Sequence, residues 1–173
     1  RIFDGLSAEQ QAVLKDAPAE TIVVDVPGKS APTMALMAHY DSATVEADEN
    51  GHQQITDGTS LGAADDGYGV AAIVETLRAL KAEGRQPENS LKIVITDGEE
   101  VGARNEMRHH RADYENVDLV LNLEARGTSG PALMFETSSN NSAVAGYFLS
   151  HVKQPVAGSL LPSLYARMPN TTD

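Results

Sequence analysis

Two neighbouring carboxylates, Glu99 and Glu100, follow directly on an apolar, β-branched run at residues 93–95. The run predicts a buried strand that ends at residues 96–98. Ligands of open α/β sheets bind beyond the carboxyl ends of the strands, so this strand brings paired acids to the edge where a functional site is expected. Adjacent glutamates are equally compatible with a solvated acidic loop, and this segment alone does not decide between the two.

A second strand end carries an imidazole. Residues 33–40 predict a strand, and His39 and Asp41 stand two residues apart at its extended end, so both side chains point to one face. The Asp41 carboxylate is then placed to accept the second N–H of the imidazole, as carboxylates do for metal-bound histidines. A single histidine at a strand end is otherwise often a hydrogen-bonded structural residue.

Two aspartates, Asp65 and Asp66, stand in a run of small residues at 62–69 that leads into a predicted helix at residues 70–83, with Gly84 as its stop. An aspartate at this point is typical of a helix N-cap, because it meets unsatisfied N–H groups and the positive end of the helix dipole. We expect one aspartate to cap the helix and the other to be available for chemistry.

These acids and His39 fall on one edge of a sheet if the strands run parallel, together with Glu124, which follows a predicted buried strand at residues 117–123. One imidazole and several carboxylates, without sulfur, suit zinc or a similar divalent ion. Carboxylate-rich sites often hold two ions about 3.5–4 Å apart. One of the adjacent glutamates would bind metal, while the other takes a proton from an activated water molecule.

Four segments, in this order, resemble the co-catalytic di-zinc aminopeptidase family: HYDS at 39–42, GAADDGYG at 62–69, DGEEVG at 97–102 and NLEARG at 122–127. The likeness runs from about residue 33 to 137, and the fourth segment looks most like the membrane-bound endoplasmic-reticulum metallopeptidase branch. The resemblance implies an α/β fold, a three-layer α/β/α sandwich with a mixed, largely parallel central sheet.

The resemblance also implies hydrolysis of N-terminal peptide bonds by two Zn²⁺ ions, so the expected partners are the N-termini of peptides or proteins. Glu99 would be the general base, Asp41 would orient His39, and Asp66 would be the helix cap. The implied metal ligands are His39, Asp65, which would bridge both ions, Glu100 and Glu124. The branch implies an exported or membrane-tethered protein whose catalytic domain lies outside the cytoplasm.

One departure concerns the second zinc site. Relatives complete it with a histidine well downstream of the fourth segment, and His151 is a poor substitute because it stands in a predicted amphipathic helix at residues 142–152. We therefore expect a truncated catalytic domain with an incomplete second site and weak or no activity by itself. The predicted single domain, 1–173, divides into a lead-in at 1–20, a core at 21–152 and the start of an uncompleted segment at 153–173.

Further elements are predicted from local pattern. Residues 7–20 predict a short peripheral helix, 21–26 and 131–137 predict strands, and 42–64 predict a polar, turn-rich loop. Residues 103–116 predict an exposed helix or turn. We interpret His109 and His110 as surface residues, we favour a surface salt bridge for Arg126, and we predict no element in the run from Lys153.

Composition narrows the function classes. The balance of 13 Lys and Arg against 25 Asp and Glu gives a net charge of −12, which argues against a nucleic-acid partner. The absence of cysteine excludes disulfides and thiolate metal sites. Apolar runs such as residues 33–38 fall far short of the ~20 residues that cross a bilayer, so we expect no membrane contact from this chain itself.

Two alternatives stay open. A glutaminyl-cyclase-like aminoacyltransferase has a related fold but uses a single zinc, and the presence of both His39 and Glu124 favours the peptidase. A non-catalytic, peptidase-like ectodomain would be expected to lose its ligands, whereas Glu99 and the four ligand positions are all present here.

Overall fold

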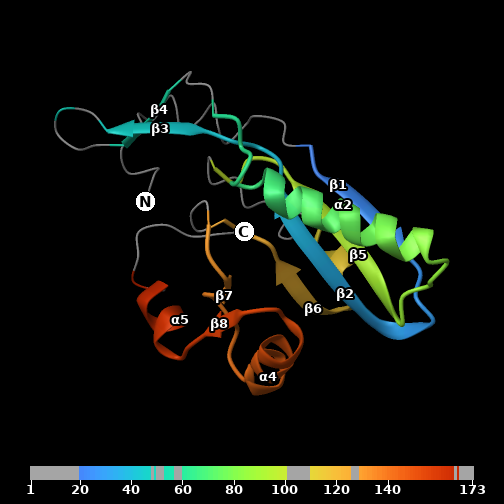
Figure 1. Cartoon of the computed structure of the whole chain (residues 1–173). Coiled ribbons are helices and arrows are strands. Elements are labelled where there is room, and N and C mark those ends of the chain that lie inside the picture. The colour runs from blue at the N-terminus through green and yellow to red at the C-terminus, as the bar shows by residue number, and fades with distance from the viewer. Residues whose placement is uncertain are drawn as a thin grey trace. The chain divides into compact units, whose positions relative to one another are not determined.

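The computed structural model describes residues 20–47, 49, 53–56, 60–100, 110–125, 129–165 and 167 (Figure 1). Residues 1–126 with 172–173 form one compact unit, and residues 127–171 form a second. All of the predicted site residues belong to the first unit. The single catalytic domain predicted for residues 1–173 stays a prediction, because this division does not test it.

A four-stranded sheet with the order β1-β5-β2-β6 forms the centre of the first unit. Its strands are β1 (Ile22–Val26), β2 (Ser30–His39), β5 (Asn89–Thr96) and β6 (Val117–Asn122). β2 runs parallel to both β5 and β6, whereas β1 pairs with β5 in the antiparallel sense. This confirms the predicted α/β class and its mixed, largely parallel sheet.

Helix α2 (Gly67–Ala82) packs on one face of this sheet. Its only fully buried large side chain is Ile73, which joins Ile93 and Ile95 of β5 in the core, with Leu77 and Leu80 packed at the edge of the cluster. The helical period of these apolar residues explains the contact, because it gathers them on a single stripe. The core fixes α2 against the sheet, and with it the segment that leads into the helix.

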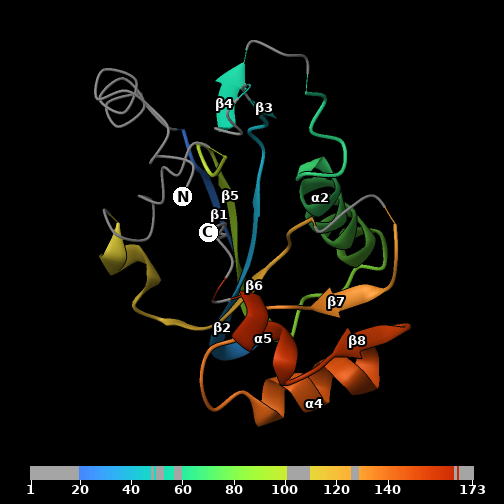
Figure 2. The same cartoon turned by 90° about the vertical axis from the view of Figure 1, so that its left-hand side faces the viewer.

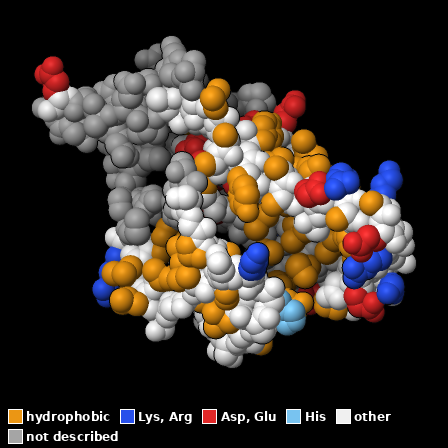
Figure 3. Space-filling model, in the orientation of Figure 1, with side chains coloured by type: hydrophobic (Ala, Val, Ile, Leu, Met, Phe, Trp, Pro, Cys, Tyr) orange, Lys and Arg blue, Asp and Glu red, His pale blue; other side chains and the backbone are white. Residues whose placement is uncertain are grey.

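Both ends of α2 follow the prediction. The Asp66 side chain accepts a hydrogen bond from the Gly69 N–H, so Asp66 is the N-cap. Gly84 follows the C-cap with a φ of +62°, a conformation that glycine adopts readily, and its N–H donates to the carbonyl oxygen of Lys81. Acidic and basic side chains alternate on the surface near this end of the helix (Figure 3), where Arg85 pairs with Glu83 at 3.0 Å.

The sequence predicted a polar, turn-rich loop at residues 42–64, but the structure shows regular strands within this segment. They form an antiparallel pair, β3 (Thr44–Ala47) and β4 (Gln53–Thr56). The signal for it was present in Asn50-Gly51, because Asn-Gly between two short strands is a strong hairpin signal. β2 also begins at Ser30, three residues before the predicted start, with an irregular register between Ser30 and Thr33.

The prediction that β6 is buried is wrong for this structure. The side chains of Leu119, Val120 and Leu121 are exposed, on both faces of the strand, and β6 lies at the edge of the sheet and pairs only with β2 in the part of the chain that the structure describes. The 3-10 helix η2 (Arg111–Tyr114) precedes it, within the segment predicted as an exposed helix or turn. Tyr114 of η2 lies 5.8 Å from the Lys92 ammonium, measured to the ring centroid.

The second unit contains β7 (Ala132–Met134), α4 (Ser142–His151), β8 (Pro155–Ala157) and α5 (Leu160–Tyr165). β7 and β8 form a parallel pair, and α4 contacts β8 (Figure 2). Phe135 and Tyr165 meet edge to face with their ring centroids 5.0 Å apart. β8 and α5 lie in the run from residue 153, where the sequence predicted no element. The short helix predicted in the lead-in begins at Ser7, which lies outside the described residues.

Candidate metal centre

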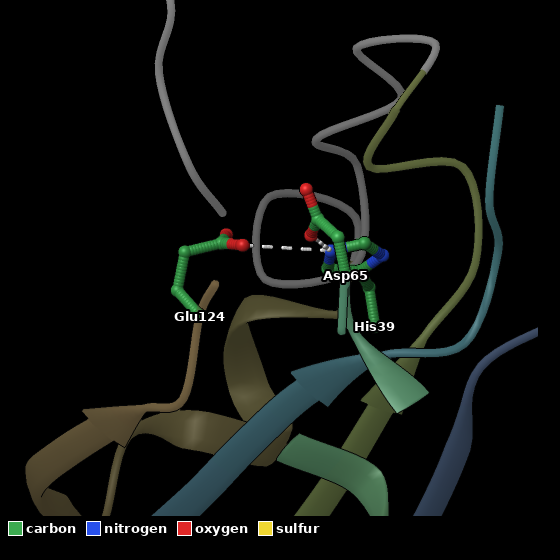
Figure 4. A group of neighbouring side chains, drawn as sticks. All are labelled: His39, Asp65 and Glu124. Carbon is green, nitrogen blue, oxygen red and sulfur yellow. Dashed lines mark hydrogen bonds and ion pairs between the residues drawn. The ribbon is translucent and has the colours of Figure 1, made fainter. Parts of the chain in front are cut away.

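His39 stands at the carboxyl end of β2 and is buried, with a side chain that is 3% exposed. Its Nε2 atom lies 3.1 Å from Oδ1 of Asp65 and 3.7 Å from Oε1 of Glu124. Figure 4 shows both carboxylates pointing toward this same nitrogen. One ligand atom from each residue lies within 4.8 Å of the others, and among the described residues this is the only His, Cys, Asp and Glu group with that property.

Glu124 reaches the site because the pairing of β2 with β6 continues past the end of β6. The Leu123 N–H donates to the carbonyl oxygen of Met37 at 2.8 Å, which holds the next residue beside the end of β2. The Glu124 side chain is 5% exposed, so its carboxylate is turned inward. Two parallel strands therefore deliver an imidazole and a carboxylate to the same edge, as the sequence predicted.

Asp65 is held by a compact glycine-rich turn. Gly62 has a φ of +57°, and a Cβ on it would lie 2.8 Å from the Cβ of Ser42. The Gly67 N–H donates to the carbonyl oxygen of Gly62 at 2.7 Å, which closes the turn around Asp65. The small residues of this turn were evident from the sequence. The contact between the hydroxyl groups of Ser42 and Ser60, which joins the end of β2 to the start of the turn, was not.

Asp66, joined to Asp65 by a cis peptide bond, plays a different part from its neighbour. Its side chain is buried with Oδ1 bound to the Gly69 N–H at 3.1 Å, while Oδ2 has no hydrogen-bond partner within the described ranges. Burial raises the pKa of Asp66 to about 7, against the opposing effect of the Gly69 N–H. The structure thus separates the two aspartates: Asp65 faces His39, and Asp66 caps α2.

Asp41 contacts His39 in a way that differs from the prediction. Nδ1 of His39 lies 3.0 Å from the main-chain oxygen of Asp41 and 3.4 Å from its carboxylate. The carboxylate accepts the main-chain N–H groups of Glu99, at 3.2 Å, and Glu100, at 3.1 Å. These bonds and His39 lower the pKa of Asp41, although burial acts in the opposite direction. The second ring nitrogen is therefore bound mainly by the backbone.

Glu99 and Glu100 follow β5 and are both partly buried. Burial, followed by the negative charge of Asp65, raises the pKa of Glu100. Glu100 therefore lies within electrostatic reach of the site, but it is not part of the group formed by His39, Asp65 and Glu124. The roles of Glu99 as base and of Glu100 as ligand stay predictions.

The electrostatics of the group suit a cation. Burial by itself lowers the pKa of His39, but hydrogen bonds to the carboxylates of Asp41, Asp65 and Glu124 outweigh it and hold this pKa well above its ordinary value. Positive charge is thus strongly favoured at this point. A divalent ion fits the same donors, because one imidazole nitrogen and carboxylate oxygens at this spacing are a normal zinc ligand set.

The described histidines His110 and His151 are not part of this group. His110 is exposed and lies 3.8 Å from Asp113, and Nδ1 of His151 lies 2.9 Å from the carbonyl oxygen of Tyr147 in its own helix. His109 and Arg126, both interpreted from the sequence as surface residues, lie outside the described residues.

Comparisons with known proteins identify the family. The sequence profile described as Peptidase family M28 matches residues 21–173. The chain is 28% identical to a vacuolar membrane protease of Lodderomyces elongisporus over 86% of this chain and 14% of that protein. It is 30% identical to a vacuolar membrane protease of Lachancea thermotolerans over 82% of this chain and 13% of that protein. A vacuolar membrane protease of Paracoccidioides lutzii is 32% identical over 72% of this chain and 11% of that protein.

The chain therefore spans about one seventh of the length of the curated relatives that it matches. The profile covers the sheet, α2 and every residue of the His39, Asp65 and Glu124 group. This confirms the resemblance on which the sequence interpretation depended: the chain belongs to peptidase family M28.

Proposed function

We propose that this chain forms the metal-binding part of a zinc aminopeptidase catalytic centre, which hydrolyses the N-terminal peptide bond of peptides or proteins. The observation that carries the proposal is the convergence of His39, Asp65 and Glu124, from three separate parts of the chain, within 4.8 Å. Membership of peptidase family M28 and the names of the relatives support a protease.

The donor set divides between two ions. His39, Asp65 and Glu124 would hold the first Zn²⁺ ion, because their ligand atoms already face one another. Asp65 would also hold the second ion together with Glu100, since its carboxylate has two oxygens and only one of them faces His39. Among the described residues, Asp65 and Glu100 are the two that we assign to this second ion.

Proton transfer is assigned to Glu99. When bound, the ions supply polarisation of the scissile carbonyl and a lower pKa for an attacking water molecule. Glu99 takes the proton of that water and passes it to the nitrogen of the leaving amine. The excess of carboxylates around the site attracts the protonated α-amine of a substrate, which favours N-terminal over internal peptide bonds.

The names of the relatives also bear on location. They are vacuolar membrane proteases, and we propose that the whole protein associates with a membrane and exposes this part of the chain outside the cytoplasm. In the part of the chain that the structure describes, no helix has the length and apolarity needed to cross a bilayer.

The test is release of amino acids from aminoacyl reporter substrates by the full-length protein, with and without a chelator. Activity that is lost with the chelator and restored by zinc is expected, together with loss of turnover in Glu99→Gln while zinc stays bound. Glu88→Gln serves as the matched control, because Glu88 is exposed and pairs with Lys29 at 3.1 Å. Chelator-resistant hydrolysis, or full turnover in Glu99→Gln, would contradict the proposal.

A further inference from the structure

The Asp41 carboxylate joins the ends of two neighbouring strands. β2 and β5 pair in parallel, and their pairing continues one step beyond β2 because the Tyr40 N–H donates to the carbonyl oxygen of Thr96 at 3.0 Å. Past that point the backbones no longer pair directly. Instead, Oδ1 of Asp41 accepts the Glu99 N–H at 3.2 Å, and Oδ2 accepts the Glu100 N–H at 3.1 Å.

The turn between β5 and Glu99 is shaped for this contact. Gly98 has a φ of +81°, which L side chains rarely adopt, and it stands between the bend at Asp97 and the turn at Glu99–Glu100, directly after β5. Successive main-chain N–H groups after such a turn form a concave site for an anion, and here the Asp41 carboxylate is that anion. The Asp41 side chain is 16% exposed, so water competes little for these bonds to a charged acceptor.

His39 contacts both the main chain and the carboxylate of Asp41. Its Nδ1 atom lies closer to the main-chain oxygen of Asp41, at 3.0 Å, than to the carboxylate, at 3.4 Å. The main-chain oxygen is present whichever side chain stands at position 41. Replacing the carboxylate therefore keeps the nearer of the two imidazole acceptors, while it removes an acceptor from Glu99 and Glu100.

We propose that Asp41 is the positioning residue of the Glu99–Glu100 segment: its two oxygens hold two successive main-chain amides and so fix where both glutamate side chains begin. The inference rests on the proposed function for the roles of Glu99 and Glu100, and it goes beyond the orientation of His39. Asp41 acts through these glutamates, because its own oxygens are occupied by their N–H groups.

Amide hydrogen exchange in the metal-free, full-length protein tests this directly. Asparagine offers only one carbonyl oxygen, so in Asp41→Asn at least one of the two amides loses its acceptor and faces an NH₂ group. We expect that amide to exchange about tenfold faster or more, as the loss of one hydrogen bond to a charged group predicts. Unchanged exchange at Glu99 and Glu100 would overturn the proposal.

Asp97→Asn is the matched control, since it makes the same chemical change in the same segment. Asp97 accepts the Glu20 N–H, at 3.4 Å, whereas the Glu99 and Glu100 N–H groups donate to Asp41, so the exchange of these two amides should stay at the wild-type rate. The exchange rate of the Ile93 main-chain amide, in the core of β5, provides an internal reference. Equal acceleration of the Ile93 amide in Asp41→Asn would show general destabilisation and would also overturn the proposal.

Kinetics of the zinc-loaded protein give a second readout. If Asp41 positions the base, Asp41→Asn lowers kcat by tenfold or more and leaves KM and the affinity of the first zinc ion within about threefold of wild type. A change confined to zinc affinity would contradict the proposal and favour a role through His39. Absence of aminopeptidase activity in the wild type would refute the proposed function, while the exchange result would still decide the role of Asp41.

Discussion

Gly62 stands at the tightest point of the turn that holds Asp65, and its replacement by alanine tests whether this turn sets the site. The φ of +57° at Gly62 costs an L-residue about 1–2 kcal/mol. The new Cβ would also lie 2.8 Å from the Cβ of Ser42, and relieving such an overlap costs about 1–3 kcal/mol. Together these terms predict that Gly62→Ala lowers the free energy of unfolding by about 2–5 kcal/mol.

The chain offers a matched control in Gly84, which has a φ of +62° and no heavy atom within 4 Å of the position of a Cβ. Gly84→Ala should therefore cost only the backbone term of about 1–2 kcal/mol. Urea denaturation of both variants and of the wild type gives the comparison. In a Ser42→Gly background, the additional cost of Gly62→Ala should fall to that of Gly84→Ala, since the overlapping atom is gone.

Zinc titration of the same variants connects the turn to the site. Gly62→Ala should weaken zinc binding, because a shifted turn moves Asp65 away from His39, whereas Gly84→Ala should leave the affinity unchanged. If Gly62→Ala costs no more stability than Gly84→Ala and binds zinc normally, the turn relaxes freely and the reasoning is wrong.

Further outcomes follow from the core, the metal group and the cap. Ile73→Ala should lower the free energy of unfolding by about 2–5 kcal/mol in chemical denaturation, while Val74→Ala, at a 54% exposed neighbour, should change it by less than about 0.5 kcal/mol. Loss of a residue that only supports a metal ligand typically lowers metal affinity about 10–100-fold. Glu124→Gln removes a proposed ligand itself, so calorimetry should show a larger loss of zinc affinity, whereas Glu83→Gln should leave zinc affinity unchanged. The pKa of Asp66 is raised from 3.8 to about 7, so the folded metal-free protein binds this proton more tightly than the unfolded chain. Its contribution to stability is present below pH 3.8 and is lost as the pH rises through about 7, and Asp66→Asn should flatten this part of the measured profile.

The elements that the sequence predicted well are those whose local pattern and packing agree. α2 begins within three residues of its predicted start because an apolar stripe, the Asp66 cap and the Gly84 stop all indicate the same helix. β5 is predicted by a β-branched run and is buried along most of its length. Since strands of this kind run parallel in α/β sheets, their ends also indicated where His39 and Glu124 meet.

What the sequence could not supply depends on pairing in three dimensions. An apolar run at residues 117–123 predicts a strand, but only the strand order shows that β6 lies at the edge of the sheet with its side chains exposed. The β3–β4 pair was missed because the polar composition of residues 42–64 outweighed the Asn50-Gly51 signal. The contact of Asp41 with the two glutamate amides links residues 58 and 59 positions apart, and no local pattern reports a contact of that range.

Both acidic pairs of the site pose the same electrostatic problem, because adjacent carboxylates repel each other. In the Asp65–Asp66 pair the structure separates the roles: one side chain faces His39, and the other is bound to the N-terminus of α2, where the helix dipole favours its charge. The Glu99–Glu100 pair is held at its backbone instead, by the Asp41 carboxylate, which accepts both main-chain N–H groups. In the roles that we propose, one glutamate supplies a ligand and the other a base, so the backbone of this pair needs a fixed position, and we propose that Asp41 provides it.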